Sequence, residues 1–269
     1  MTVARTIPPS LAPVIEQLEL DAPAVVTTED LAVFVGHERG TADVRQLAYE
    51  LQREGWLGRL RTRNAWEFLP GSRAGAFGSA DRFIEFRAKR AVDPSWSGVL
   101  AMESAASLRS LAQRVPELEV VALPCGEALP KAFIRDWRCV HVDLGPSAST
   151  ALNGLPTWTV DALVVGIAAR PSGYRDVAGL AQWLPDAARQ IDVAEIIRLL
   201  RPLNDATRQR ASYLLTAVGG TELATPVLAA YPPSQPVWFG PRVRGGRFDR
   251  ATMVNDTLLH GYLIIGIGA

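Results

Sequence analysis

The sequence predicts an α+β protein that consists of a small N-terminal domain and a larger C-terminal domain. The chain has 269 residues, which is long enough for two domains of unequal size. Hydrophobic residues make up 48% and charged residues 21% of the chain, as in an ordinary globular protein. A stretch rich in Pro, Gly and Ser, LPGSRAGAFGSA, interrupts the apolar pattern at residues 69–80. We therefore expect domains at residues 1–70 and 81–269, joined by a linker at residues 71–80.

Three helices are predicted in the N-terminal domain. Apolar residues recur at helical spacing in residues 11–18 and again in residues 44–51. Between these stretches, the sequence TTED at residues 27–30 is a capping signature and predicts a second helix over residues 29–35. Thr41 is the expected N-cap of the third helix.

A hairpin is predicted directly after the third helix. Two short runs, Trp56–Leu60 and Ala65–Leu69, carry apolar and aromatic residues, and a polar turn at residues 61–64 joins them. Three helices followed by a hairpin indicate a winged helix-turn-helix domain, whose third helix would be the recognition helix and whose hairpin would be the wing.

The pattern of the larger domain is mixed at first and then mostly helical. Two strands are expected at residues 118–123 and 138–144, and two extended runs are expected near the end of the chain. The expected helices are residues 81–92, 103–113, 161–169, 177–184, 193–200, 207–218 and 222–229, and the final extended runs are residues 250–254 and 262–267.

The face of the third helix opposite its apolar stripe carries side chains that are suited to DNA. Arg45 can pair with guanine and Gln46 with adenine in the major groove. Tyr49 and Thr41 could meet phosphates, and Arg53 extends the same face. We predict that these five residues contact DNA.

The predicted wing supports the same function. Arg59, Arg61 and Arg63 alternate along its first strand and turn, so that they project from one face toward phosphate or the minor groove. Charge is also segregated, because residues 1–38 hold one basic and six acidic side chains, whereas residues 39–80 hold seven basic and four acidic ones. The alternative is that these arginines are an ordinary solvated face, since 26 of the 28 basic residues in the chain are arginines.

The sequence offers little for catalysis, metal binding or membrane insertion. Its two cysteines and three histidines are scattered without the spacing of a zinc site, and it lacks GxSxG, HExxH, CxxC and Walker signatures. No uncharged stretch reaches the roughly 18 to 20 residues of a membrane-spanning helix. We therefore expect a cytoplasmic protein that is not an enzyme and that has no cofactor, metal or membrane partner.

One basic segment remains open to two interpretations. The loop Arg242–Arg247 has the sequence RVRGGR, which could hold a phosphate or a nucleic-acid backbone. It could equally be an ordinary mobile turn, because Gly-rich segments are common in loops.

Several short motifs, none of them catalytic, follow one another along the chain. In chain order they are Val25–Leu31, Gly55–Leu57, Trp66–Pro70, Glu103–Ala106, Asp161–Leu163, Ala168–Pro171, Gln209–Leu215 and Val254–Asp256. In their order, and over nearly the whole chain, they resemble the AbiEi-like antitoxins of AbiE-type toxin–antitoxin systems. The resemblance implies that a winged helix-turn-helix domain is followed by a mixed α/β antitoxin domain.

The resemblance also implies a function and its partners. The protein would repress its own operon by binding double-stranded operator DNA, as a monomer in solution or a dimer on DNA. It would also counteract a nucleotidyltransferase-like toxin, by direct contact, indirect antagonism or modification of the toxin. The alternatives are a ligand-sensing winged-helix regulator unrelated to a toxin, which would need a pocket in the C-terminal domain, and a pure protein-interaction module.

Overall fold

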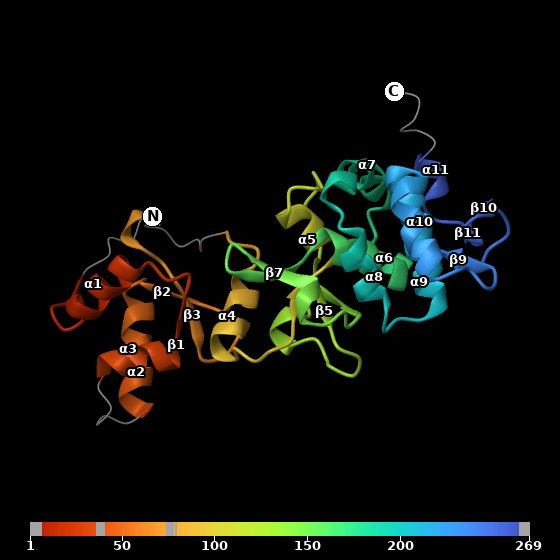
Figure 1. The fold of residues 1–269 in the computed structure, drawn as a ribbon. Helices are drawn as coiled ribbons and strands as arrows, with labels where there is room; N and C mark the ends of the chain where they lie inside the picture. Colours follow the sequence, from red (N-terminus) through yellow and green to blue (C-terminus); the bar gives the residue numbers. More distant parts are fainter. Residues whose placement is uncertain (1–6, 36–40, 74–77, 79, 264–269) are drawn as a thin grey trace. The chain divides into compact units, whose positions relative to one another are not determined.

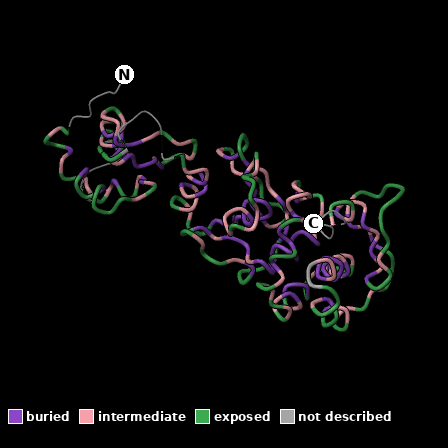
Figure 2. The backbone as a smooth tube through the Cα atoms, turned by 90° about the horizontal axis from the view of Figure 1, so that it is seen from above, coloured by how far each residue is buried: buried purple, intermediate pink, exposed green. Residues whose placement is uncertain are grey.

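The chain has a mixed α and β fold, as the sequence predicts (Figure 1). The computed structural model describes residues 7–35, 41–73, 78 and 80–263. The chain divides into two compact units, Met1–Trp96 and Ser97–Ala269, and each has buried residues in its interior (Figure 2) that form an apolar cluster. Among the described residues, no helix combines the length and apolar character needed to cross a membrane.

The N-terminal unit combines helices with a small antiparallel sheet. Its elements are α1 (Ala12–Asp21), β1 (Val25–Thr27), α2 (Thr28–Val35), α3 (Thr41–Arg53), β2 (Leu57–Arg59), β3 (Ala65–Phe68), the 3-10 helix η1 (Gly71–Arg73) and α4 (Ile84–Val92). The strand order is β1-β3-β2, with Val26 opposite Trp66 and Gly58 opposite Glu67. The central strand β3 therefore joins the segment before α2 to the segment after α3.

The core of this unit contains the apolar residues that the helical spacing singled out. Val44, Ala48 and Leu51 of α3 are buried, and Leu47 is partly buried against the same cluster. Asp30 accepts hydrogen bonds from the backbone N–H and the hydroxyl group of Thr27, each over less than 3 Å, as expected for the capping signature at the start of α2. Burial of one helical stripe is what orients α3 and leaves its opposite face exposed.

Helix α4 belongs to the N-terminal unit, whereas the sequence analysis assigned it to the second domain. It packs on β1 and β3, and its Phe86 lies with its ring centroid 5.0 Å from that of Trp96. The compact units accordingly divide after Trp96 and not within residues 71–80. Gly78, in the segment taken for a linker, lies so close to the Glu67 carboxylate that a Cβ atom would overlap it. Close packing against Glu67 therefore favours glycine at this position.

The C-terminal unit begins with a five-stranded mixed sheet. Its strands are β4 (Val99–Leu100), β5 (Glu119–Leu123), β6 (Trp137–His141), β7 (Ser149–Leu152) and β8 (Leu155–Trp158), in the order β6-β5-β4-β8-β7. The β5–β6 and β4–β8 pairs are parallel, and the β4–β5 and β7–β8 pairs are antiparallel. Helix α5 (Met102–Leu108) packs on β5.

A block of helices and a second, three-stranded sheet complete this unit. The helices are α6 (Val160–Ala169), α7 (Val177–Ala187), α8 (Val193–Leu200), α9 (Asp205–Gly219), α10 (Thr221–Ala230) and α11 (His260–Leu263). The strands are β9 (Val237–Phe239), β10 (Arg247–Asp249) and β11 (Val254–Asp256), in the order β10-β11-β9. Four 3-10 helices lie between these elements: η2 (Lys131–Phe133), η3 (Pro146–Ala148), η4 (Pro171–Gly173) and η5 (Ala188–Gln190).

The end of the chain differs from the sequence-based prediction. The run predicted as extended at residues 250–254 becomes a strand only at β11, and residues 262 and 263 end a short helix. Residues 264–269 of the second predicted run lie outside the described part of the chain.

Helix α6 is the centre of the C-terminal unit. It lies against α5, α8 and α9, and all its residues except the last, Ala169, are buried (Figure 1). The Thr159 hydroxyl group caps its start by accepting a hydrogen bond from the backbone N–H of Ala162 over 3.1 Å. An apolar sequence buried on all sides explains why residues 160–168 lack a polar stripe.

The packing of α6 predicts the effect of one substitution. In Gly166→Ala the new methyl group would overlap the ring of Trp158, which is 2% exposed and cannot move aside. We expect the free energy of unfolding to fall by about 1 to 3 kcal/mol, measured by urea denaturation. Gly261→Ala is the control, since a Cβ atom there meets nothing within 4 Å. A Gly166→Ala protein as stable as the parent would contradict this description of the core.

Candidate nucleic-acid interface

Helix α3 presents the predicted contact residues on its solvent-facing side. Arg45, Gln46, Tyr49 and Arg53 are all exposed, and Tyr49 retains 58% of its accessible surface. Arg45 makes no hydrogen bond or ion pair with any described residue. Thr41 begins the helix, but its side chain lies outside the described part of the chain.

Two residues of this face are engaged with neighbouring carboxylates. The Gln46 amide donates a hydrogen bond to Glu50 Oε1 over 2.7 Å, and Arg53 forms an ion pair with Glu54 at 2.9 Å. Both contacts lie on the protein surface, where such pairs contribute little to stability and exchange readily for other partners. They leave these side chains available to a ligand.

The β2–β3 hairpin brings the three predicted wing arginines together beside the end of α3. Arg59, Arg61 and Arg63 are exposed, and all three line an open hollow of about 810 Å³ whose other lining includes Gln52 of α3. Arg59 and Arg63 have no hydrogen-bonding or ionic partner among the described residues. The helical spacing places Gln52 on the same face as Arg45, Gln46 and Tyr49, although Gln52 was not among the predicted contacts.

Glu85 of α4 holds the hairpin turn in place, although Glu85 was not among the residues predicted for this site. One carboxylate oxygen accepts the backbone N–H of Arg61 over 2.7 Å. The other oxygen accepts the backbone N–H of Thr62 over 3.0 Å and its hydroxyl group over 2.8 Å. Glu85 is 7% exposed, so these charge-assisted bonds form largely away from water.

The contact with Glu85 also distinguishes the three arginines from one another. Arg61 Nε lies 3.5 Å from Glu85 Oε1, so that part of its charge is balanced within the protein. A second tie comes from the backbone N–H of Thr28, which donates to the Asn64 carbonyl group over 3.0 Å. The turn is therefore fixed on two sides. Among the described residues, Arg59 and Arg63 are the arginines of the hairpin without a counter-charge.

Two polar clusters of the C-terminal unit are each centred on a buried carboxylate, Glu103 in one and Asp161 in the other. At the start of α5, Glu103 forms an ion pair with Arg138 and accepts the backbone N–H of Arg175. Burial lowers the pKa of Arg138, and the neighbouring Glu103 carboxylate opposes this effect. Burial raises the pKa of Tyr174, whose hydroxyl group accepts a hydrogen bond from the Trp183 indole over 2.8 Å.

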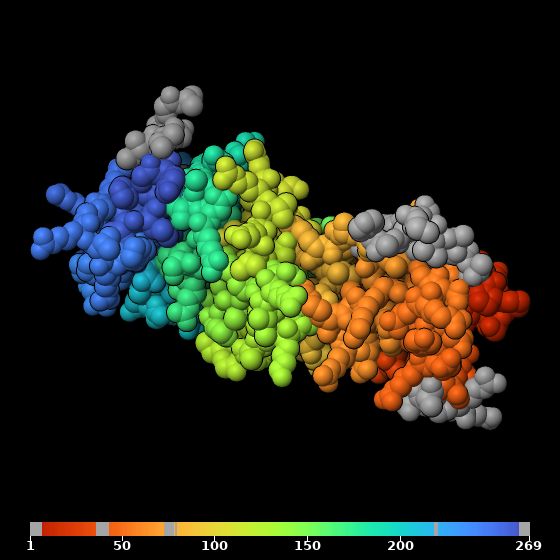
Figure 3. All heavy atoms as spheres, turned by 180° about the vertical axis from the view of Figure 1, so that it is seen from behind, coloured from red at the N-terminus to blue at the C-terminus, as the bar shows by residue number. Residues whose placement is uncertain are grey.

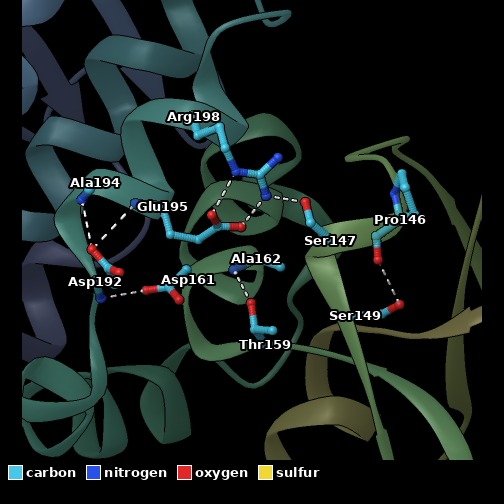
Figure 4. A network of polar contacts seen from close by, with 10 residues as sticks. All are labelled: Pro146, Ser147, Ser149, Thr159, Asp161, Ala162, Asp192, Ala194, Glu195 and Arg198. Carbon is cyan, nitrogen blue, oxygen red and sulfur yellow. Dashed lines mark hydrogen bonds and ion pairs between the residues drawn. The ribbon is translucent and has the colours of Figure 1, made fainter.

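The second cluster ties α6 to α8 (Figure 4). Asp161 accepts the backbone N–H of Asp192 over 2.8 Å, and Asp192 in turn caps α8 by accepting the backbone N–H of Ala194. Burial raises the pKa of Asp161. Arg198 completes the network through Glu195 and the hydroxyl group of Ser147.

These clusters have a structural role, because their carboxylates accept hydrogen bonds from backbone N–H groups and form ion pairs with arginine. Within the described ranges, no group of three or more His, Cys, Asp and Glu side chains is arranged to hold a metal ion. Cys125 is exposed and Cys139 is half-buried, and both are free thiols.

The Glu85 contact predicts the effect of replacing its carboxylate. In Glu85→Gln an amide N–H₂ group takes the place of one acceptor oxygen, so that at least one backbone N–H of the turn loses its partner. Such a loss costs about 1 to 3 kcal/mol for a buried group. We expect faster hydrogen exchange at the Arg61 and Thr62 amides, measured by NMR. Glu50→Gln, which replaces a carboxylate on α3 whose hydrogen bond with Gln46 is exposed, is the control. Unchanged exchange in Glu85→Gln would show that the carboxylate does not hold the turn.

Comparison with known proteins gives a family for the second unit and a structural relative for the whole chain. No curated protein shows significant sequence similarity to the chain. The crystal structure of the RV2827C protein from Mycobacterium tuberculosis is similar, with a TM-score of 0.79 and 26% sequence identity over 100% of this chain and 98% of that chain. Residues 97–217 match the family model of the AbiEi antitoxin C-terminal domain, and this part of the chain belongs to that family.

Proposed function

We propose that the protein is an antitoxin that also represses its own transcription. The antitoxin role rests on the AbiEi antitoxin C-terminal domain at residues 97–217. In this proposal the N-terminal unit is a winged helix-turn-helix that binds operator DNA, and the C-terminal unit counteracts a nucleotidyltransferase-like toxin.

One observation carries the proposal of DNA binding. Gln52, near the C-terminal end of α3, lines one open hollow together with Arg59, Arg61 and Arg63 of the β2–β3 hairpin. A helix of this size fits the major groove, and an adjacent hairpin then meets the phosphate backbone or the minor groove. The element order α1-β1-α2-α3-β2-β3 is the one that a winged helix requires.

The chemistry of the exposed side chains supports a division of labour. Arg45 and Gln46 offer bidentate hydrogen bonds for base edges, which specify sequence. Arg59 and Arg63, which have no counter-charge in the described part of the chain, offer positive charge for phosphates, and phosphate contacts position the protein without reading sequence. Residues 1–38, by contrast, hold six acidic side chains and one basic one, so α1 and α2 would face away from DNA.

We further propose that the C-terminal unit acts by binding and not by catalysis. Three of its buried carboxylates, Glu103, Asp161 and Asp256, each accept backbone N–H groups, which supports structural roles for them. We infer that the protein is a monomer in solution or a dimer on DNA.

A ligand-sensing regulator is a second candidate, because one cavity favours it. A hollow of about 420 Å³ between α7, α9, β10 and α11 combines apolar walls with the polar side chains of Tyr213, Arg247 and His260. Pro185, inside α7, has no N–H for the carbonyl group of Ala181, and both residues line the hollow. A small molecule that bound there and changed DNA affinity would favour this candidate over the antitoxin.

The proposed DNA contacts predict a graded mutational response. We expect Arg45→Ala to lower the preference for one base pair by about 1 to 3 kcal/mol, and Arg63→Ala to weaken binding to every sequence. Arg61→Ala should weaken binding less than Arg63→Ala, because Glu85 already balances part of its charge. The measurement is fluorescence anisotropy of the full chain with a duplex from upstream of its own gene and with a scrambled duplex.

The exposed Arg189→Ala, in the C-terminal unit, is the control for general loss of charge. If Arg45→Ala and Arg63→Ala both bound the two duplexes as the parent protein does, α3 and the hairpin would not be the interface.

A binding mechanism predicts that neither partner is modified. After the chain is incubated with the toxin encoded beside it and with nucleoside triphosphates, intact-mass spectrometry should give unchanged masses for both proteins. A mass increase on the toxin that required this chain would show that the antitoxin acts as an enzyme.

A further inference from the structure

Three arginines of the C-terminal unit come from three separate segments and lie near one another. Arg170 follows the last residue of α6, Arg210 lies in α9, and Arg242 lies in the loop between β9 and β10. None of them forms an ion pair with a carboxylate within the described part of the chain.

Arg210 is fixed in its place by the backbone. Its Nε donates to the Trp238 carbonyl group over 2.6 Å, and one terminal nitrogen lies 3.5 Å from the Ala168 carbonyl oxygen. Carbonyl groups orient a guanidinium group but carry no net charge to balance it. The remaining N–H groups of this fork are therefore held in position for another acceptor.

Arg242 is positioned by an aromatic ring. Its guanidinium carbon lies 5.1 Å from the centre of the Trp238 ring, within the range of a cation–π contact. The same tryptophan thus supports Arg210 through its carbonyl group and Arg242 through its ring. The two arginines are kept close together although their charges repel.

The repulsion among the three arginines affects the pKa of Arg210. Burial lowers the pKa of Arg210, and the charges of Arg242 and Arg170 lower it further, with no opposing carboxylate among the residues that the structure describes. A fixed group of like charges without a counter-charge favours the binding of an anion.

The surrounding loop adds charge and accessibility. Every residue from 241 to 248 is exposed, including Arg244 and Arg247, and side chains from this blue part of the chain stand out from the surface in Figure 3. The nearest acid in the sequence, Asp249, uses one oxygen for the backbone N–H and the hydroxyl group of Thr252, each over 2.8 Å. The loop therefore extends the basic surface.

We propose that Arg170, Arg210 and Arg242 form a second nucleic-acid site, which binds the phosphodiester backbone of duplex DNA without reading its sequence. Arginine is suited to this task because its planar fork matches two phosphate oxygens. The site deepens the proposed function, on which it rests, since it would let the C-terminal unit add affinity to a sequence-reading N-terminal unit.

Salt dependence tests the proposal in the full-length protein. The logarithm of the affinity for a random-sequence duplex is measured against the logarithm of salt concentration for the parent, for Arg170→Ala/Arg242→Ala and for the control Arg114→Ala/Arg189→Ala. Both pairs replace exposed arginines of the same unit, whereas Arg210 is left intact because it holds two segments together. Thermal unfolding of each variant checks that it remains folded.

We expect the slope to become shallower by about 1.8 in Arg170→Ala/Arg242→Ala, corresponding to two lost phosphate contacts, and to stay unchanged in the control. Equal slopes for the parent and Arg170→Ala/Arg242→Ala would overturn the proposal. So would a variant that lost binding to the toxin and kept its DNA affinity, because the cluster would then face an acidic protein surface.

The same measurement with Arg45→Ala/Arg63→Ala separates this inference from the proposed function. If only the α3 and wing variant weakens DNA binding, the second site is wrong and the winged helix stands. If only Arg170→Ala/Arg242→Ala weakens it, the second site stands and the N-terminal interface is wrong.

Discussion

The carboxylate of Glu85 is the contact on which the arrangement of the N-terminal unit depends. It lies on a helix that follows the hairpin by more than 15 residues, yet it accepts both consecutive N–H groups of the hairpin turn. Without it, the backbone N–H groups of Arg61 and Thr62 would lose their acceptor, and Arg61 would lose an ionic contact. Because α4 also packs on β1 and β3, Glu85 joins the hairpin turn to the rest of the unit and restrains the arginines of the hairpin.

The same contact explains why three arginines in one short segment need not be equivalent. Arg61 shares the negative charge of Glu85, whereas Arg59 and Arg63 have no described counter-charge. A carboxylate next to a basic interface weakens attraction to phosphate, so its presence is best understood as a structural requirement of the turn. Glu85 thus lowers the positive charge of the hairpin but keeps its turn ordered.

In the C-terminal unit the organising element is α6, because α5, α8, α9 and strand β8 of the first sheet pack against it. The match to the AbiEi antitoxin domain ends at residue 217, within α9, whereas the compact unit continues through α10 and the second sheet. Arg170 and Arg210 lie inside the matched region, and Trp238 and Arg242 lie beyond it. The proposed phosphate site would therefore combine the family domain with the segment that follows it.

Local signals predicted the parts of the structure that local forces determine. The stripe of α3 and the cap of α2 are readable because they depend on neighbours within one or two turns. Asn153 and Gly154, both with positive φ, form the tight turn between β7 and β8, and an Asn-Gly pair could have predicted this missed hairpin. Glu85 could not be found in this way, since nothing near it in the sequence indicates a partner 24 residues away.

Mapping DNA onto the full chain by NMR tests the central claim most directly. An operator duplex is titrated into isotope-labelled protein, and the backbone signals that move are assigned. The account predicts the largest shifts at Arg45, Gln46 and Tyr49 of α3 and at Arg59 and Arg63 of the hairpin. Shifts confined to α1 and α2, with α3 and the hairpin unchanged, would contradict it.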